Sequence, residues 1–341
     1  MTIAMLYRFK EVIKKFKGLI MNNIPRPVSK LSDSYTSQPK TKPIDSNIPQ
    51  SICAVSSLTN KPKNQDDCKY SFVKEANAHI LVVADGVGSH KFAEVGSSFV
   101  VKKAVELLEE AVKLSPETLD FDSIFFEIQS ALDIHIENNF PDKSDLKPGA
   151  CFGTTLIVGI DFPDRFVAAY VGNGSIFNIS GYFANFPPSI YLPWNAINML
   201  NPHTIEQDGR EALYKIFTWK GEKQDFTPTV FELKKNKDLP GEIFVLTTDG
   251  VYSADHSIPG KDGENTIWIP SSRTTEILYD YLKNYMLDKS ISFDNNALER
   301  MLGRYLQNVK ESKAMDDDTT LGVIVTGNCL NYFTDKRSKT E

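Results

Sequence analysis

The stretch HILVVADGVGS, residues 79–89, joins an apolar run to an acid and a glycine. A continuous apolar run of this length predicts a strand that is buried on both faces. The pattern returns in EIFVLTTDGVYS, residues 242–253, so that Asp85 and Asp249 each end a predicted strand directly before a glycine. Glycine lets the backbone turn sharply or approach a ligand closely. These two stretches predict a sheet core with carboxylates at one end.

Two more acidic groups stand beside predicted strands. Asp66 and Asp67 precede KYSFVKE, and Asp316, Asp317 and Asp318 precede TTLGVIVTG. An isolated buried carboxylate is costly, but carboxylates gathered at one end of a sheet bind hard cations such as Mg²⁺ or Mn²⁺. A single Asp-Gly pair is typical of an ordinary turn. The four acidic groups together favour a metal site.

The order of the remaining blocks indicates the fold class. Helical periodicity runs over residues 92–112, 121–140, 274–285 and 296–309, and further strands are predicted at 51–58, 152–160, 165–172 and 175–180. The last three strands are too close in sequence for crossover helices, so antiparallel neighbours are expected. Because strand groups and helix pairs occur in clusters, the sequence predicts an α+β layered fold and not a doubly wound sheet.

The ends of the chain differ in composition from its middle. Residues 1–20 predict a basic amphipathic helix that lies on an anionic membrane surface, docks on a partner or packs on its own domain. Residues 21–50, rich in Pro, Ser, Asn and Lys, predict a flexible linker. The globular domain is expected at 51–329 and a C-terminal tail at 330–341.

Within the domain, residues 181–240 read as an irregular insertion with one helical patch, REALYKIF at 210–217. It is expected to form a flap or partner surface, or simply to pack on the domain.

Composition limits the function classes. The net charge of −6 argues against nucleic acid as the main partner. The four cysteines include no C-x-x-C pair, which is typical of reduced thiols in the cytosol. No stretch approaches the ~18 uninterrupted apolar residues of a membrane span. We expect a cytoplasmic monomer whose candidate membrane contact is the segment 1–20.

Six blocks, taken in order, resemble the metal-dependent serine/threonine phosphatases of the 2C type (the PPM family), most of all their bacterial branch. The blocks are NQDD at 64–67, VVADGVGSHKFAEVGS at 82–97, GTTLIVGI at 153–160, AAYVGNGSIF at 168–177, VLTTDG at 245–250 and DDDTTLGVIV at 316–325. No single block is decisive, but their common order over about residues 51–327 makes a strong signal. The resemblance implies two central antiparallel sheets stacked face to face, flanked by helix pairs, with the metals at one end.

The resemblance also implies roles for residues. Asp85 would bridge two Mn²⁺ or Mg²⁺ ions, Gly86 would offer its carbonyl, and Asp66 would support the second ion. Asp249 and Asp317 would complete the first metal site, with Asp316 and Asp318 one step away from the chosen register. The implied activity is hydrolysis of phosphorylated serine or threonine in a protein by a metal-activated water, with Asp85, Asp249 and Lys61 as the catalytic candidates.

The sequence departs from the family pattern at three positions of the implied site. Lys61 stands where relatives usually carry an arginine on the substrate phosphate, and it offers a point charge in place of a planar fork. Asn173 and Ser253 stand where relatives carry acids of a third metal site, so two ions are expected. His90 is expected to be a surface residue and not a general acid. The alternative function is a catalytically weak relative that serves as a phosphoprotein-binding or regulatory module.

Overall fold

The computed structural model describes residues 50–180, 195–207, 210–235, 241–253, 258–262, 265–269, 273–312, 315 and 317–339. These residues lie within one compact unit, Asn47–Glu341. The predicted N-terminal helix and most of the predicted linker lie outside the described residues, as do residues 181–194 of the predicted insertion.

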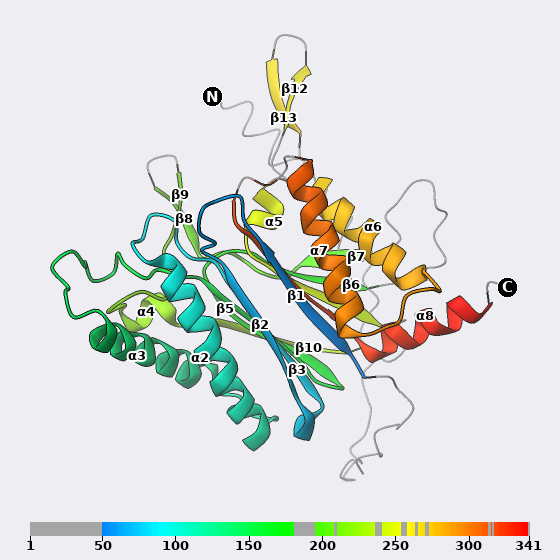
Figure 1. Ribbon diagram of the computed structural model, residues 1–341, viewed down its shortest axis with the longest axis horizontal. Coiled ribbons are helices and arrows are strands. Elements are labelled where there is room, and N and C mark those ends of the chain that lie inside the picture. The colour runs from blue at the N-terminus through cyan, green and yellow to red at the C-terminus, as the bar shows by residue number, and fades with distance from the viewer. Residues whose placement is uncertain are drawn as a thin grey trace, which may run out of the picture. The chain divides into compact units, whose positions relative to one another are not determined.

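Two five-stranded sheets form the centre of the described structure, and every neighbouring pair of strands in them is antiparallel (Figure 1). The first sheet has the order β1 (Ile52–Leu58), β14 (Thr319–Val325), β11 (Glu242–Thr247), β6 (Ser175–Ser180) and β7 (Asn195–Asn198). The second has the order β10 (Thr229–Lys234), β5 (Arg165–Val171), β4 (Leu156–Asp161), β3 (Ala78–Ala84) and β2 (Asp67–Val73).

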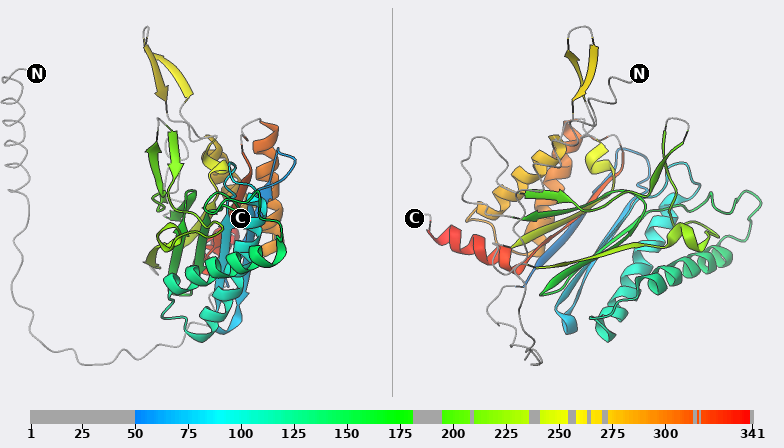
Figure 2. Two further views of the ribbon diagram at one scale, coloured as in Figure 1. Left: turned by 90° about the vertical axis from the view of Figure 1, so that its left-hand side faces the viewer. Right: turned by 180° about the vertical axis from the view of Figure 1, so that it is seen from behind.

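Helices cover the outer face of each sheet (Figures 1 and 2). Against the second sheet pack α2 (Ala93–Leu114), α3 (Phe121–Asn139) and the short α4 (Lys223–Phe226). Against the first pack α6 (Arg273–Leu287), α7 (Asn295–Glu311) and α8 (Gly327–Lys339). A third apolar cluster fills the space between the sheets. The predicted fold class, two stacked antiparallel sheets flanked by helices, is confirmed.

The apolar run that opened the sequence analysis lies in the middle of these layers. Along β3, Ile80 and Val82 face the helices, whereas Leu81 and Val83 face the other sheet. Both faces are therefore buried, which explains why the run does not alternate with polar residues. Gly322 of β14 makes room for this strand, because a Cβ there would lie 2.3 Å from a methyl carbon of Leu81.

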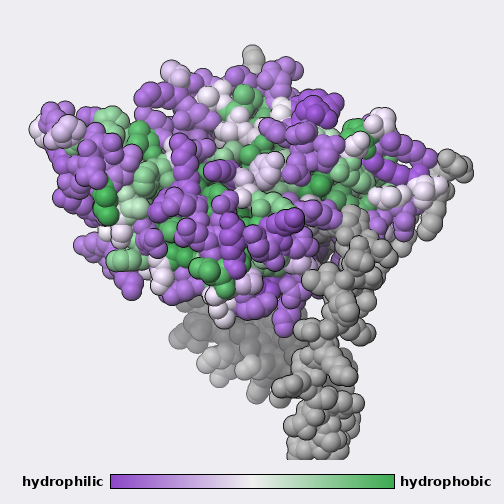
Figure 3. Space-filling model, turned by 60° about the horizontal axis from the view of Figure 1, so that its bottom comes forward, coloured by the Kyte–Doolittle hydropathy of each residue, from purple (hydrophilic) through white to green (hydrophobic). Residues whose placement is uncertain are grey.

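Smaller elements complete the described part of the chain. They are the 3₁₀ turn η1 (Lys74–Ala76), the helix α5 (Gly250–Ser253), and two hairpins formed by β8 (Thr204–Gln207) with β9 (Arg210–Leu213) and by β12 (Ile258–Asp262) with β13 (Asn265–Ile269). No helix of the described residues is long and apolar enough to cross a membrane. On the face shown in Figure 3, hydrophobic residues form small patches separated by hydrophilic ones.

Three predictions need correction. The helical patch at 210–217 is wrong, since Arg210–Leu213 forms β9; the intervening Asp208 and Gly209 in the sequence are the dipeptide typical of tight hairpins. The strand β6 does not pair with β5 but crosses to the other sheet and pairs with β11. The expected tail at 330–341 is largely helical, because Leu330 and Phe333 of α8 bury their side chains in the core.

A core substitution tests the stacking of the two sheets. Phe244 of β11 and Phe166 of β5 are fully buried, and their rings stack with centroids 3.9 Å apart. Phe244→Ala should lower the free energy of unfolding by about 3–5 kcal/mol, because it leaves a cavity between the sheets. Urea denaturation measures the loss. Ile134→Ala, at a position that is 61% exposed on α3, is the control and should change it by less than about 1 kcal/mol. Equal losses in the two variants would contradict this packing.

Candidate active site

The predicted acidic residues meet at one end of the two sheets. A pocket of about 140 Å³ is lined by Lys61, Asp85, Gly86, Asn173, Asp249 and Asp317, among other residues. Asp66 lies within hydrogen-bond reach of Asp85. All six residues proposed from the sequence as catalytic or metal-binding are thus brought to one place, although they come from segments far apart in the chain.

Backbone contacts at the end of β3 fix the position of Asp85. Its amide donates to the hydroxyl of Thr155 at 2.9 Å, and the amide of Thr155 donates to the carbonyl of Asp85 at 2.8 Å. The next amide, of Gly86, donates to the carbonyl of Gln65 at 3.1 Å. A Cβ on Gly86 would lie 2.6 Å from that carbonyl oxygen, so only glycine permits this approach. The glycine therefore brings the turn that carries Asp66 against Asp85.

Asp66 is a buried acid with one satisfied oxygen. Its Oδ2 accepts the hydroxyl of Thr248 at 2.8 Å, while its Oδ1 is buried and has no hydrogen-bond partner. Burial raises the pKa of Asp66 to about 7, although hydrogen bonds from Thr248 and Thr320 oppose the shift. The role of Thr248 was missed from the sequence, where nothing but its place beside Asp249 distinguishes it.

Asp85 lies between two other carboxyl groups. Burial, followed by the charges of Asp66 and Asp249, raises the pKa of Asp85 well above its usual range. The pKa values of Asp66 and Asp85 are thus both raised, so a positive charge near them would stabilise their ionised forms.

This set of oxygens fits a hard divalent cation. The residues that line the pocket include three aspartates but no cysteine or histidine, which favours Mg²⁺ or Mn²⁺ over softer metals. The unpartnered Oδ1 of Asp66 is a further acceptor for a cation. Among the described residues, no group of three or more His, Cys, Asp or Glu side chains is arranged so that it could hold a metal ion without moving. A bound ion would therefore have to displace any proton on Asp66 or Asp85 and draw the carboxylates around it.

Asp249 lies just after β11, next to a close backbone approach at Gly250 and in a hydrogen bond with Asn173. A Cβ on the following Gly250 would lie 1.9 Å from the carbonyl oxygen of Asp318, so the chain passes close to β14 here. The amide Nδ2 of Asn173 donates to Oδ2 of Asp249 at 2.8 Å. Asn173 thus meets a proposed metal ligand directly. The side chain of Ser253 lies outside the described residues, so the effect of this serine on a third metal site stays a prediction.

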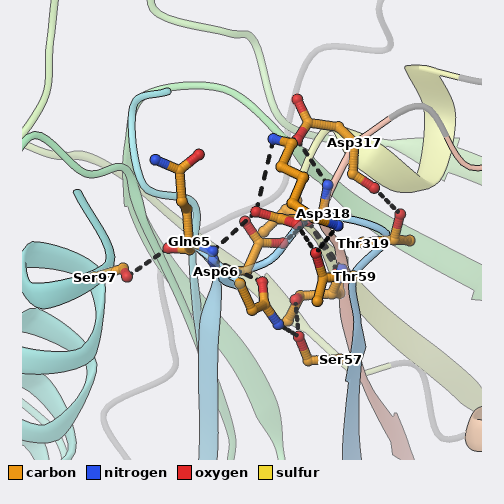
Figure 4. Close-up of polar contacts among 12 residues, drawn as sticks. Ser57, Thr59, Gln65, Asp66, Ser97, Asp317, Asp318 and Thr319 are labelled. Carbon is orange, nitrogen blue, oxygen red and sulfur yellow. Dashed lines mark hydrogen bonds and ion pairs between the residues drawn. The ribbon is translucent and has the colours of Figure 1, made fainter. Parts of the chain in front are cut away.

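The structure separates the last three acids. Asp317 lines the pocket and is half exposed. Asp318 is buried and accepts the Thr59 hydroxyl and, at 2.8 Å, the amide of Gln65, as the dashed contacts of Figure 4 show. Asp316 lies outside the described residues. This geometry supports Asp317 as the candidate ligand and gives Asp318 a different task, which is to anchor the loop before β2; the sequence alone did not reveal it.

Lys61 places a positive charge among these acids. Its ammonium contacts Oδ1 of Asp317 and lies 3.7 Å from Oδ2 of Asp318. Burial alone would lower the pKa of Lys61, but the hydrogen bond to Asp317 and the charges of Asp317, Asp318 and Asp85 outweigh burial and raise it. Lys61 therefore stays protonated throughout the neutral pH range.

His90 takes no direct part in the pocket. It is half-buried beside Gly153, where a Cβ would lie 2.1 Å from its Nδ1, and it is not among the residues that line the pocket. The expectation of a surface residue is therefore only partly right, and the view that His90 is no general acid stays a prediction. Burial lowers the pKa of His90, which leaves the ring neutral at pH 7.

Comparisons with known proteins give the same picture of sequence pattern and fold. Residues 55–186 match the family model described as protein phosphatase 2C. No curated protein matches the sequence closely. Among solved structures, a bacterial serine phosphatase is similar with a TM-score of 0.51 at 18% identity, over 80% of this chain and 96% of that one.

Two other solved structures share the fold. The serine/threonine phosphatase PstP/Ppp of Mycobacterium tuberculosis has a TM-score of 0.50 at 16% identity, over 81% of this chain and 99% of that chain. A sex determining protein of C. elegans has a TM-score of 0.56 at 9% identity, over 84% of this chain and 68% of that chain. The resemblance inferred from the six blocks is confirmed: the chain carries the sequence pattern of the protein phosphatase 2C family over residues 55–186 and has the fold of the 2C-type phosphatases.

Proposed function

We propose that the chain is a metal-dependent protein serine/threonine phosphatase. The observation that carries the proposal is the convergence of Asp66, Asp85, Asp249 and Asp317 on one small pocket that also holds Lys61. Bringing four carboxyl groups together is unfavourable unless a bound cation offsets their negative charge. The family model and the shared fold support the reaction class.

The residues divide the proposed work between them. Asp66, Asp85, Asp249 and Asp317, with the carbonyl of Gly86, would hold two Mn²⁺ or Mg²⁺ ions. Bound ions would supply the Lewis acidity that transfer of a phosphoryl group to water requires. The ammonium of Lys61 would bind a phosphate oxygen as a point charge. A pocket of about 140 Å³ has room for a phosphoryl group, so the flanking peptide would lie on the surface around it.

The second candidate is a phosphoprotein-binding module with weak or no catalysis. It is favoured by Asn173, whose amide occupies an oxygen of Asp249 where relatives carry another acid. The neutral amide also removes a charged ligand from the pocket, which supports two bound ions and not three. Hydrolysis of a chromogenic aryl phosphate with and without Mn²⁺ separates the two candidates.

One prediction of the proposed function concerns metal binding. The chelator-treated chain should bind two Mn²⁺ ions in a calorimetric titration, and Asp85→Asn should lose most of this binding and reduce hydrolysis at least a hundredfold, because Asp85 is central to both proposed sites. Asp67→Asn is the matched control. Asp67 begins β2 beside Asp66 but does not line the pocket, so its loss should leave both readouts nearly unchanged. Full activity in Asp85→Asn would refute the proposed function.

A further prediction concerns pH in the metal-free chain. The pKa of Asp66 rises to about 7 on folding, so between about pH 4 and 7 the folded state binds more protons than the unfolded state. The contribution of Asp66 to stability is therefore full at low pH and is lost as the pH rises to 7.

Urea denaturation in chelator at several pH values should show this contribution in the difference between wild type and Asp66→Asn. Subtracting the two stabilities cancels the contribution of groups that the substitution leaves unchanged. His203 is one such group: burial lowers its pKa to about 4, and its effect on stability has the opposite sign. Saturating Mn²⁺ should stabilise wild type more than Asp66→Asn, because the variant lacks a proposed metal ligand. Wild type should lose stability relative to Asp66→Asn as the pH rises from about 4 to 7, and a gain over the same range would contradict the prediction.

A further inference from the structure

The loop that carries Lys61 is fixed at its backbone. The amide of Lys61 donates to the hydroxyl of Thr59 at 2.9 Å, and that hydroxyl donates to the buried Asp318. The carbonyl of Thr59 accepts the ammonium of Lys310 at 3.0 Å, and the side-chain amide of Asn60 donates to the carbonyl of Met315 at 3.0 Å. These contacts hold the backbone in place, so any movement of the Lys61 ammonium comes from its own four-carbon side chain.

Lys61 is the one basic residue among the described residues that line the pocket. Lys63, two positions along, points its charge elsewhere and pairs with Glu94 at 2.7 Å. The ammonium of Lys61 therefore carries the positive charge that faces Asp317 and Asp85 when no metal is bound. It touches an oxygen that the proposed function assigns to a metal ion.

The contact between Lys61 and Asp317 is easily exchanged. The two side chains are 39% and 51% exposed, and an ion pair with this much access to water contributes little net stability. A divalent ion bound to Asp317 and Asp249 attracts the carboxylates more strongly and repels the ammonium. The flexible stem of lysine can then turn the charge toward the open pocket, whereas an arginine fork would be held by two parallel hydrogen bonds.

We propose that Lys61 is an exchangeable cation, which neutralises Asp317 in the metal-free protein and is released by metal binding to hold the phosphate of the substrate. This inference rests on the proposed function, since it takes Asp317 as a metal ligand. It implies an order of binding, with the metal first and the phosphate second. It also implies that each ligand strengthens the binding of the other, because both favour the released position of Lys61.

The test uses the full chain after removal of metal, titrated with Mn²⁺ in a calorimeter without phosphate, and then with inorganic phosphate at saturating Mn²⁺. Lys61→Met removes the competing charge and should bind Mn²⁺ about fivefold more tightly than wild type. The same variant should bind phosphate about tenfold more weakly, because the pocket has lost its ammonium. Lys61→Arg keeps the charge but can hold Asp317 through two parallel hydrogen bonds, so it should bind Mn²⁺ more weakly than wild type.

Lys63→Met is the matched control, since it removes a lysine of the same loop whose charge is paired with Glu94 outside the pocket. It should leave both affinities within about twofold of wild type. Circular dichroism of each variant verifies the fold. Unchanged or weaker Mn²⁺ binding in Lys61→Met would overturn the exchange, as would an equal gain in Lys63→Met.

One more variant separates this inference from the function on which it rests. If Asp85→Asn loses Mn²⁺ binding while Lys61→Met gains none, the metal site stands and only the exchange is refuted. If Asp85→Asn binds Mn²⁺ as tightly as wild type, the proposed metal site itself fails, and the exchange falls with it. Loss of binding in Asp85→Asn together with a gain in Lys61→Met supports both.

Discussion

The structure depends on one electrostatic constraint: acidic side chains are gathered and partly buried at one end of the sheets. Burial and mutual repulsion disfavour their charged forms, as the raised pKa values of Asp66 and Asp85 show. Such a cluster persists only if protons, cations or hydrogen-bond donors offset its charge. The structure shows two such donors, the Lys61 ammonium on Asp317 and the amide of Asn173 on Asp249.

The two sheets make this cluster possible. Asp85 and Asp249 stand at the ends of β3 and β11, which are central strands of different sheets, and Asp317 lies just before β14. Stacking the sheets through Phe166 and Phe244 brings these ends to the same side of the core. Close backbone approaches at Gly86 and Gly250 then set the final positions of the acids. The residues that look like turn glycines in the sequence are points where the segments flanking the strands approach each other closely.

The sequence predicted the features that follow from short-range patterns. Apolar runs identified the central strands, helical periodicity identified α2, α3, α6 and α7, and the acids beside strands marked the pocket. What it could not predict depends on tertiary contacts. Nothing in three consecutive aspartates shows that Asp318 is buried under the Thr59 loop while Asp317 faces the pocket. Likewise, the pairing of β6 with β11 depends on a turn through Gly172 and Gly174, both with positive φ, which carries the chain to the other sheet.

Two of the three departures from the family pattern, Lys61 and Asn173, have a common physical meaning. Lys61 and Asn173 each place hydrogen-bond donors on a proposed metal ligand, Asp317 and Asp249 respectively. Both contacts offset part of the negative charge of the acids, although the exposed pair of Lys61 and Asp317 adds little net stability. The same contacts compete with the ion for the ligand oxygens. Lys61 and Asn173 therefore predict weaker metal binding than in relatives and do not require the loss of the reaction.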